Sequence, residues 1–516
     1  MTSEAVRLDA PVIIVGAGPV GLSLALGLAR YDVASILVEP RTQELLESRA
    51  LVMWARTLEI MRDWNAYEAL RESGDFVTNF RACNASTNAP IIDVDFNNVE
   101  DVLEDPGVLI IPQYQTERVL RTLVEANPLC DLRIGVAATG VTHDAHGATV
   151  ATFAQGTADT LRASYAVGCD GAHGVMRHAL ELTLEGITYD SRVILSDDVI
   201  DATTSNAARA RVLLDRPGLD VAIRFAPNEW RVIATVPKDT SDEAALSDDA
   251  HRARLARIFG ADSITHTKWK SIFKIHRRHV QKFSVGRVAL AGDAAHLNSP
   301  AGGQGMNAGI QDAANLAWKI AFALRDRGDS TALFESYAIE RREMVTDTVE
   351  AFTDRLTRIA IGVSPRIKRT GIRIVARVTR GRGIQRKLCR TLGMLGGRYT
   401  TSPIVDARHP LAGRRIDDLV LADGARINRV RNGNAAIVLV GDIAIADMAA
   451  IQIAKPPKRW HVKPPIALIV RPDGCVASVV TKPTRERITK AWNKAFCNTI
   501  DLPLVRYSTR SSIEML

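Results

Sequence analysis

Three glycines near the N-terminus, Gly16, Gly18 and Gly21, have the spacing of a phosphate-binding turn. The first allows a tight turn, the second lets the backbone approach a pyrophosphate, and the third lets a helix pack closely on a strand. Glu39 follows roughly 20 residues later, where a carboxylate can accept hydrogen bonds from a ribose diol. These residues predict a site for a dinucleotide whose ribose carries no phosphate.

The residues around this turn predict the elements that position it. Pro11–Val15 is an apolar, β-branched run typical of a central parallel strand, and the apolar stretch Leu22–Leu28 predicts a helix. A second strand is expected over Ala34–Val38, ending at Glu39. The N-terminus of a helix offers unpaired N–H groups and the positive end of a dipole to phosphate. This order favours a Rossmann-like unit and leaves both FAD and NAD open.

Two further aspartate–glycine pairs follow predicted strands. Asp170 precedes a glycine and then a helix, and Asp293 follows a glycine at the end of an apolar run. A strand-end aspartate can accept a hydrogen bond from a ribose hydroxyl, and glycines let backbone lie flat against a planar ring. A helix beginning there would favour the negative charge of a reduced flavin. This loop and helix start contain Pro300, Gly302, Gly303, Gly305, Met306 and Asn307.

With these three fingerprints in order, the sequence resembles the class A flavoprotein aromatic hydroxylases, the group of p-hydroxybenzoate hydroxylase and phenol hydroxylase. Recognisable family motifs occur over roughly residues 10–400, and the resemblance continues more weakly to the end of the sequence. It implies an α/β fold: a Rossmann-like FAD-binding domain, an inserted β-sheet substrate domain and a C-terminal thioredoxin-like α/β domain. It also implies FAD as the bound cofactor.

The resemblance carries candidate cofactor residues onto this sequence. Glu39 and the three glycines would hold the ADP half of FAD. Asp170 would serve FAD and NAD(P)H, Asp293 would contact the ribitol or ribose, and the glycine-rich loop would surround the isoalloxazine ring. The implied cofactor-binding set is Gly16, Gly18, Gly21, Glu39, Arg49, Gln113, Arg118, Asp170, Asp293, Gly302, Gly303, Gly305, Met306 and Asn307.

Some of these positions also fit plainer roles or depart from the family pattern. Arg49 and Arg118 fit solvated surface residues, and Gln113 fits a polar residue at the end of a strand. The family usually has Ser or Thr where this chain has Gly174, and many relatives have a second proline at Ser299. These two differences concern the NAD(P)H approach and the local shape of the reaction site.

The implied reaction is hydroxylation of an aromatic, phenolic small molecule. NAD(P)H would reduce FAD, and O2 would add to form a C4a-hydroperoxyflavin that delivers a hydroxyl group to an electron-rich ring. The sequence offers no metal-ligand cluster, no nucleophile elbow and no tryptophan signature of flavin halogenases, so the flavin carries the chemistry. No second glycine-rich unit would hold NADPH or NADH, which favours its transient binding. The catalytic candidates are Pro300, His276 and Arg277, and we identify no general base.

We expect four segments along the chain. Residues 1–182 form the first part of the FAD-binding domain, with a substrate-domain segment at about 73–110. Residues 183–284 form the middle substrate-binding sheet, where Arg211, Arg224 and Arg231 point either outward or toward an anionic substrate. Residues 285–400 return to the FAD-binding domain with a helical segment. Residues 401–516 form the thioredoxin-like domain, which lacks CxxC and suits folding or dimer contacts.

Charge and cysteine spacing indicate the cellular location and the partners that we expect. The net charge is +8, with much of the excess between Arg355 and Arg398. That stretch is interpreted as a solvated helical face or, alternatively, as a membrane or phosphate-binding surface. Six cysteines without paired spacing and a polar start predict a cytoplasmic protein with reduced thiols. We expect a small aromatic substrate and O2 as partners, a homodimer as an option, and neither nucleic acid nor stable membrane insertion.

Three other hypotheses stay open at this stage. One is a hydroxylase that tailors a polyketide or inactivates an antibiotic. Another is an FAD-binding protein that sequesters a reactive intermediate without hydroxylating it. A third is a hydroxylase that works at a membrane surface through the basic segment 355–398.

Overall fold

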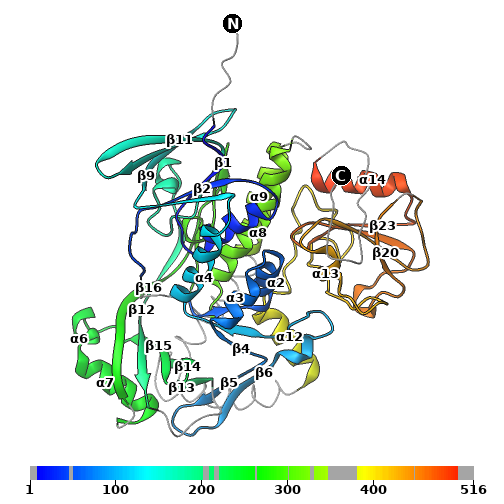
Figure 1. Cartoon of the computed structure of the whole chain (residues 1–516). Coiled ribbons are helices and arrows are strands. Elements are labelled where there is room, and N and C mark those ends of the chain that lie inside the picture. Colours follow the sequence, from blue (N-terminus) through cyan, green and yellow to red (C-terminus); the bar gives the residue numbers. More distant parts are fainter. Residues whose placement is uncertain are drawn as a thin grey trace.

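In the computed structural model, the glycine-rich motifs lie on a mostly parallel sheet (Figure 1). The order is β17–β18–β11–β1–β2–β8, and every pair on this path except β17–β18 is parallel. The strands are β1 (Ala10–Val15), β2 (Ser35–Glu39), β8 (Cys130–Ile134), β11 (Thr157–Gly168), β17 (Ser284–Val285) and β18 (Val288–Leu290). The structure describes residues 8–45, 50–201, 209–213, 220–261, 264–299, 302–325, 330–346, 381–446 and 448–497.

Helix α1 (Pro19–Ala29) lies at the centre of this domain. Proline at its first position suits a helix start, because that residue has no N–H group to leave unpaired. Almost all of α1 is buried, and it packs against α4 (Gln113–Glu125) and α8 (Gly305–Leu324). Glycine permits the contact with α8, because a Cβ at Gly309 would lie 2.6 Å from Val20 Cγ2. Beside this layer lie β9 (Ala137–His143), β10 (Ala148–Ala154), α5 (Val175–Ala179), η3 (Gly292–Ala294) and α9 (Ser330–Met344).

A second, mostly antiparallel sheet has the order β19–β16–β12–β15–β14–β13–β5–β6. Its two 16-residue strands, β12 (Glu185–Ile200) and β16 (Ile264–His279), run from the parallel sheet into this region (Figure 1). Helices α6 (Asp242–Leu246) and α7 (Asp248–Phe259) pack against it. Its other strands are β5 (Asn79–Asn84), β6 (Pro90–Asp95), β13 (Ala210–Leu213), β14 (Asp220–Ala226), β15 (Glu229–Val236) and β19 (His296–Leu297).

A small three-stranded sheet and short helices join these two layers. Its order is β3–β7–β4, and both pairs are antiparallel. Its residues share a core with the second sheet and with α12, a helix from much later in the chain. The elements are β3 (Val52–Met53), α2 (Ala55–Asp63), α3 (Tyr67–Glu72), β4 (Asp75–Val77), η1 (Phe96–Val99), β7 (Val108–Ile110) and α12 (Arg382–Leu392).

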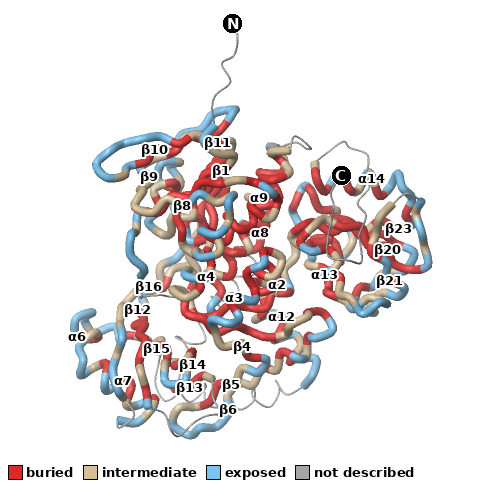
Figure 2. Tube along the Cα trace, viewed as in Figure 1, coloured by how far each residue is buried: buried red, intermediate tan, exposed pale blue. Residues whose placement is uncertain are grey.

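The C-terminal module has a thioredoxin-like sheet in the order β21–β20–β22–β23, in which only the β20–β21 pair is parallel. All five successive residues of β20 are buried (Figure 2), so both faces of this strand are covered. Ile437 and Leu439 join the core around the parallel sheet, whereas Val438 and Val440 join a separate core of the module. Its elements are α13 (Ile427–Arg431), β20 (Ala436–Val440), β21 (Ile451–Ile453), η5 (Lys458–Trp460), β22 (Ile466–Val470), β23 (Val476–Thr481) and α14 (Arg485–Phe496).

Candidate active site

The sequence motifs meet at one edge of the parallel sheet. The strand ends pair in register: Val38 with Val15, Val15 with Gly168, and Gly168 with Leu290. The carboxyl ends of β2, β1, β11 and β18 therefore lie side by side. Ligands of open α/β sheets bind in the crevice beyond this edge. The motif residues that follow these ends are Glu39, Gly16, Asp170 and Gly292.

The three N-terminal glycines are required for different reasons. Gly16 has φ +100°, and a Cβ there would lie 2.5 Å from the carbonyl oxygen of Cys169. A Cβ at Gly21 would lie 1.9 Å from the carbonyl oxygen of Gly16, so both glycines serve the fold. Gly18 caps α1, and a Cβ there would meet nothing within 4 Å. That open space lies where a pyrophosphate would approach the helix N-terminus.

Glu39 is buried at the end of β2 and holds the glycine turn. Its Oε2 accepts a 2.8 Å hydrogen bond from the Ala17 N–H, and its Oε1 accepts one of 2.7 Å from Arg41 Nε. Burial opposes ionisation, but the hydrogen bonds from Arg41 and Ala17 lower the pKa of Glu39 below its ordinary value. The carboxylate is therefore charged at neutral pH and positioned beside the turn.

Asp170 has an acceptor oxygen that lacks a partner. The Met176 N–H donates to its Oδ2 at 2.9 Å, whereas Oδ1 is buried without a hydrogen-bond partner among the described residues. Burial raises the pKa of this carboxyl. A Cβ at Gly174 would lie 2.2 Å from Oδ1, so the glycine that departs from the family pattern leaves room for this carboxylate. A buried acceptor without a partner fits a hydroxyl or amide donor of a cofactor.

Arg177 joins the two aspartate motifs, a role that the sequence analysis did not assign. Its side chain is buried, with Nη2 donating to the Ala172 carbonyl at 2.6 Å and Nη1 to the Ala294 carbonyl at 3.3 Å. It lies in α5, seven residues after Asp170 in the chain. Its spacing in the aspartate–glycine motif is a signal that could have identified it.

The turn with Asp293 is held from beneath by a carboxylate on α8. Asp312 Oδ2 accepts the Gly292 N–H at 3.0 Å and lies 2.8 Å from His296 Nε2. Both His296 and Asp312 are buried, whereas Asp293 is exposed on η3. His296 and Asp312 therefore hold the turn from the protein interior, whereas Asp293 faces outward from it.

The glycine-rich loop leads into the N-terminus of α8. Gly302 and Gly303 have positive φ angles, and a Cβ at Gly305 would meet nothing within 4 Å. Asn307 is fully buried and ties the loop to β3: it accepts the Trp54 N–H at 2.8 Å. Its Nδ2 donates to the carbonyls of Val52 and Gly303 at 2.9 and 2.8 Å. Met306 is half-buried against the core, and Pro300 lies outside the described residues.

The other predicted flavin-lining residues fall into three groups. Gln113 begins α4, not a strand end, and its Oε1 accepts the Ala50 N–H at 3.2 Å. Arg118 is more than half exposed and pairs with Glu44 at 2.7 Å. Arg49 lies outside the described residues. Gln113 therefore shapes the segment next to Arg49, whereas Arg118 forms a surface ion pair.

The catalytic candidates His276 and Arg277 are half-buried near the end of β16. This end pairs with β19, the strand that leads from the Asp293 turn toward the glycine-rich loop. His276 Nδ1 lies 3.0 Å from Thr188 Oγ1 on β12. Both residues therefore lie on a strand that borders the loop.

A buried ion pair occupies the middle sheet close to this site. Arg231 donates to both oxygens of Asp197 at 2.7 Å and to the Ala50 carbonyl at 3.0 Å. Trp269 Nε1 donates to the same carboxylate at 2.9 Å. The guanidinium of Arg231 is thus neutralised by Asp197 inside the fold. The sequence predicted instead that Arg231 points either outward or toward an anionic substrate. Arg211 donates to a carbonyl at 3.0 Å, and Arg224 is half-buried on β14.

The described residues lack two features that would point to other functions. They contain no group of three or more His, Cys, Asp or Glu side chains arranged to hold a metal ion. None of their helices is both long and apolar enough to cross a membrane. The basic stretch 355–380 lies outside the residues described.

The fold and the sheet edge define a dinucleotide-binding flavoprotein. The open space at Gly18 and Gly305 and the unpartnered Asp170 oxygen leave room and hydrogen-bonding capacity for FAD. Residues 9–352 match the family model described as an FAD-binding domain, which spans more than half of the chain. The chain belongs to this family, and FAD is its cofactor.

Several characterised proteins are similar over most of the chain. Rifampicin monooxygenase from Streptomyces venezuelae is 29% identical, with 90% of this chain and 94% of the relative covered. Pentachlorophenol 4-monooxygenase from Sphingobium chlorophenolicum is 26% identical, with 91% and 87% covered. Among solved structures, an anhydrotetracycline hydroxylase from Streptomyces rimosus has a TM-score of 0.76 at 25% identity, with 95% of this chain and 100% of that chain covered.

Proposed function

We propose that this protein is an FAD-dependent monooxygenase that hydroxylates an aromatic, phenolic small molecule with electrons from NADPH or NADH. The observation that carries the proposal is the meeting of the three motif turns at one sheet edge, in a chain of the FAD-binding family. The similarity to monooxygenases across about nine-tenths of the chain supports the reaction type.

FAD supplies hydride acceptance from NAD(P)H and activation of O2 when it is bound. Gly16, Gly18, Gly21 and Glu39 would hold its ADP half. Asp170 and Asp293 would accept hydrogen bonds from its sugar hydroxyls. The loop from Gly302 to Asn307 would lie against the ring, with the N–H groups of α8 favouring the negative charge of the reduced state.

The substrate would lie between this loop and the second sheet. Pro300, His276 and Arg277 are the proposed catalytic residues, because β16 pairs with the strand that leads into the loop. Gln113 would line the flavin side, together with Arg49. Arg118 is a weaker candidate, because its guanidinium already pairs with Glu44 at the surface.

A larger aromatic substrate is the second candidate. A rifampicin monooxygenase and an anhydrotetracycline hydroxylase are similar along most of this chain. Hydroxylation of an antibiotic or polyketide is therefore included in the proposal as an alternative substrate class. A cytoplasmic location, based on the unpaired spacing of the cysteines, and a homodimeric assembly are proposed with it.

Product analysis tests the proposal. The holoenzyme is incubated with NADPH or NADH, isotopically labelled O2, and a panel of chlorinated phenols, polyketide phenols, rifampicin and heteroaromatic acids. We expect at least one compound to gain a single labelled oxygen, with NAD(P)H consumed in step with the product. Consumption that yields only hydrogen peroxide with every compound would contradict the proposal.

A further inference from the structure

The support beneath the Asp293 turn extends toward the C-terminal module. Asp312 on α8 holds the Gly292 N–H and His296, and its other oxygen accepts a 2.6 Å hydrogen bond from Arg341 Nε on α9. Arg341 also donates to the Ala308 carbonyl of α8 at 3.2 Å. The side chains of His296, Asp312 and Arg341 are at most 1% exposed. The turn is therefore fixed by an internal, solvent-excluded group of charges.

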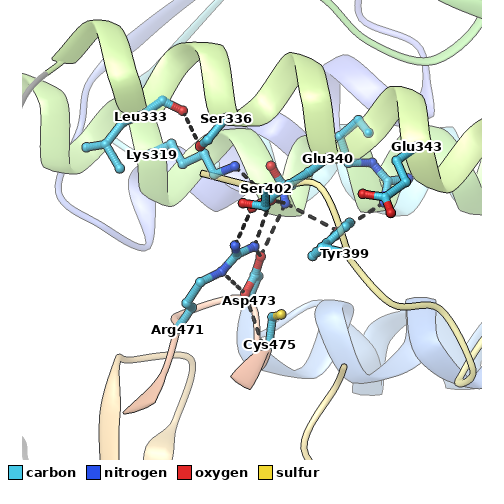
Figure 3. A network of polar contacts seen from close by, with 12 residues as sticks. Lys319, Leu333, Ser336, Glu340, Glu343, Tyr399, Ser402, Arg471, Asp473 and Cys475 are labelled. Atoms are coloured by element: carbon cyan, nitrogen blue, oxygen red, sulfur yellow. Dashed lines mark hydrogen bonds and ion pairs between the residues drawn. The ribbon is translucent and has the colours of Figure 1, made fainter. Parts of the chain in front are cut away.

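A second buried carboxylate, Glu340, lies on α9 (Figure 3). It directly precedes Arg341 in the chain. Its Oε2 accepts from Lys319 Nζ at 2.8 Å and from Asn315 Nδ2 at 2.7 Å, both on α8. Arg471, which follows β22 in the C-terminal module, donates to Oε1 at 2.5 Å and to Oε2 at 3.0 Å. One carboxylate thus ties the module to two helices of the FAD-binding domain.

Tyr399 connects the two carboxylate groups. Its hydroxyl oxygen accepts from Arg341 Nη1 at 3.2 Å and from Asn315 Nδ2 at 3.3 Å. In Figure 3 its side chain lies among Glu340, Ser402 and Glu343 at the junction of the two domains. A continuous hydrogen-bonded path therefore runs from the C-terminal module to the turn of Asp293.

Charges along this path balance among the described residues. The cations are Lys319, Arg341 and Arg471, and the carboxylates are Asp312, Glu340 and Asp473, which also pairs with Arg471. Burial alone would disfavour every one of these charges, so each depends on its partners. If Arg471 is removed, Glu340 keeps only Lys319 as a cationic partner. Asp473 loses the same ion-pair partner.

We propose that Arg471 is a positioning residue for the flavin site, which it supports through Glu340, Asn315, Tyr399, Arg341 and Asp312. The C-terminal module thereby sets the conformation of the turn that carries Asp293. This role rests on the proposed flavin contact of that turn, and it goes beyond folding or dimer contacts. Arg471 is fully buried and pairs with Glu340 and Asp473, so it would act on the affinity and reduction potential of FAD through these contacts.

Two variants of the full-length protein test this inference. Arg471→Met removes the cation, and Tyr399→Phe removes only the hydroxyl that joins the two carboxylate groups. The dissociation constant of FAD is measured by fluorescence, the flavin midpoint potential by anaerobic titration, and apoprotein stability by urea unfolding. Arg408→Met is the matched control, because Arg408 pairs with Asp406 on the exposed surface of the same module.

We expect FAD affinity to fall about tenfold or more in Arg471→Met and several-fold in Tyr399→Phe, because contacts within one network are strongly coupled. The midpoint potential should shift in both variants and remain unchanged in the control. Wild-type affinity and potential in folded Tyr399→Phe would overturn the proposal, even if Arg471→Met fails to fold. Lower apoprotein stability with an unchanged potential would likewise overturn it. None of these three measurements requires a substrate. They therefore test the role of Arg471 even if the protein hydroxylates none of the compounds in the panel.

Discussion

Gly18 and Gly21 are only three residues apart, but the structure needs them for different reasons. A side chain at Gly21 would collide with the Gly16 carbonyl, whereas one at Gly18 would project into open space. No contact among the described residues requires glycine at position 18, whereas the proposed approach of the FAD pyrophosphate would require it. Within this one turn, Gly21 is therefore needed for folding, whereas Gly18 is proposed to be needed for cofactor binding.

Gly18→Val should therefore weaken FAD binding by a factor of at least about ten while leaving the apoprotein nearly as stable as the wild type. The backbone of Gly18 is extended, a conformation that valine adopts readily. Gly21→Val is the comparison, and it should lower the free energy of unfolding by several kcal/mol, on the order expected for overpacking. FAD titration and urea unfolding measure both effects. If Gly18→Val binds FAD as tightly as the wild type, the pyrophosphate does not lie against Gly18 as proposed.

Asn307 links two elements, because it holds β3 and the glycine-rich loop together from the first turn of α8. Asn307→Ala leaves the buried Trp54 N–H and Val52 carbonyl without this partner. We expect a loss of about 2–3 kcal/mol in the free energy of unfolding. The absorption spectrum of bound FAD should also change, because the loop is released. A stable variant with an unaltered flavin spectrum would argue against this clamp.

The C-terminal module carries its own pH-dependent element. Burial raises the pKa of Asp418 to about 6, and its Oδ1 accepts the Asn428 N–H at 2.8 Å. The folded protein therefore holds a proton that the unfolded chain releases near pH 4. The resulting stabilisation is complete below that pH and is lost as the pH rises through 6. Between pH 4 and 7 the loss amounts to about 3 kcal/mol.

Asp418→Asn removes this titration and keeps an acceptor for Asn428. Urea unfolding at several pH values should show the wild type losing stability relative to the variant as the pH rises from 4 to 7. The difference between the two proteins isolates Asp418 from the other carboxylates that they share. Parallel stability curves would show that the carboxyl has its ordinary pKa.

Local elements were predictable where the signal is local. The strand, glycine turn and helix around Gly16 follow from apolar runs and glycine spacing, and the fold class was confirmed by the sheet order. The assignments of individual site residues remain predictions. Asp197 and Asp312 were missed because their partners, Arg231 and Arg341, lie 34 and 29 residues away in the chain. Such pairs are fixed by tertiary packing, which spacing within one segment does not reveal.

At the scale of the whole molecule, part of the C-terminal module packs into the core of the FAD-binding domain. Phe496 on α14 stacks on Phe322 with ring centroids 5.1 Å apart and meets Trp318 edge-on at 5.7 Å. Trp318 and Phe322 belong to α8, the helix that begins at the glycine-rich loop. The same helix thus supports the cofactor site at one end and the module toward the other. Through α8, the C-terminal module is therefore connected to the proposed flavin site, although the module has no CxxC motif for redox chemistry of its own.

The proposed hydroxylation requires that NADPH or NADH reduces the bound FAD, and we expect an aromatic substrate to accelerate this reduction. The most direct measurement is anaerobic stopped-flow reduction by NADPH and NADH, with and without phenols, polyketide phenols and heteroaromatic acids. We expect one nicotinamide to reduce the flavin and one class of aromatic compound to accelerate the reduction. A flavin that stays oxidised with both nicotinamides and every compound would contradict the account and favour an FAD protein that binds an intermediate without hydroxylating it.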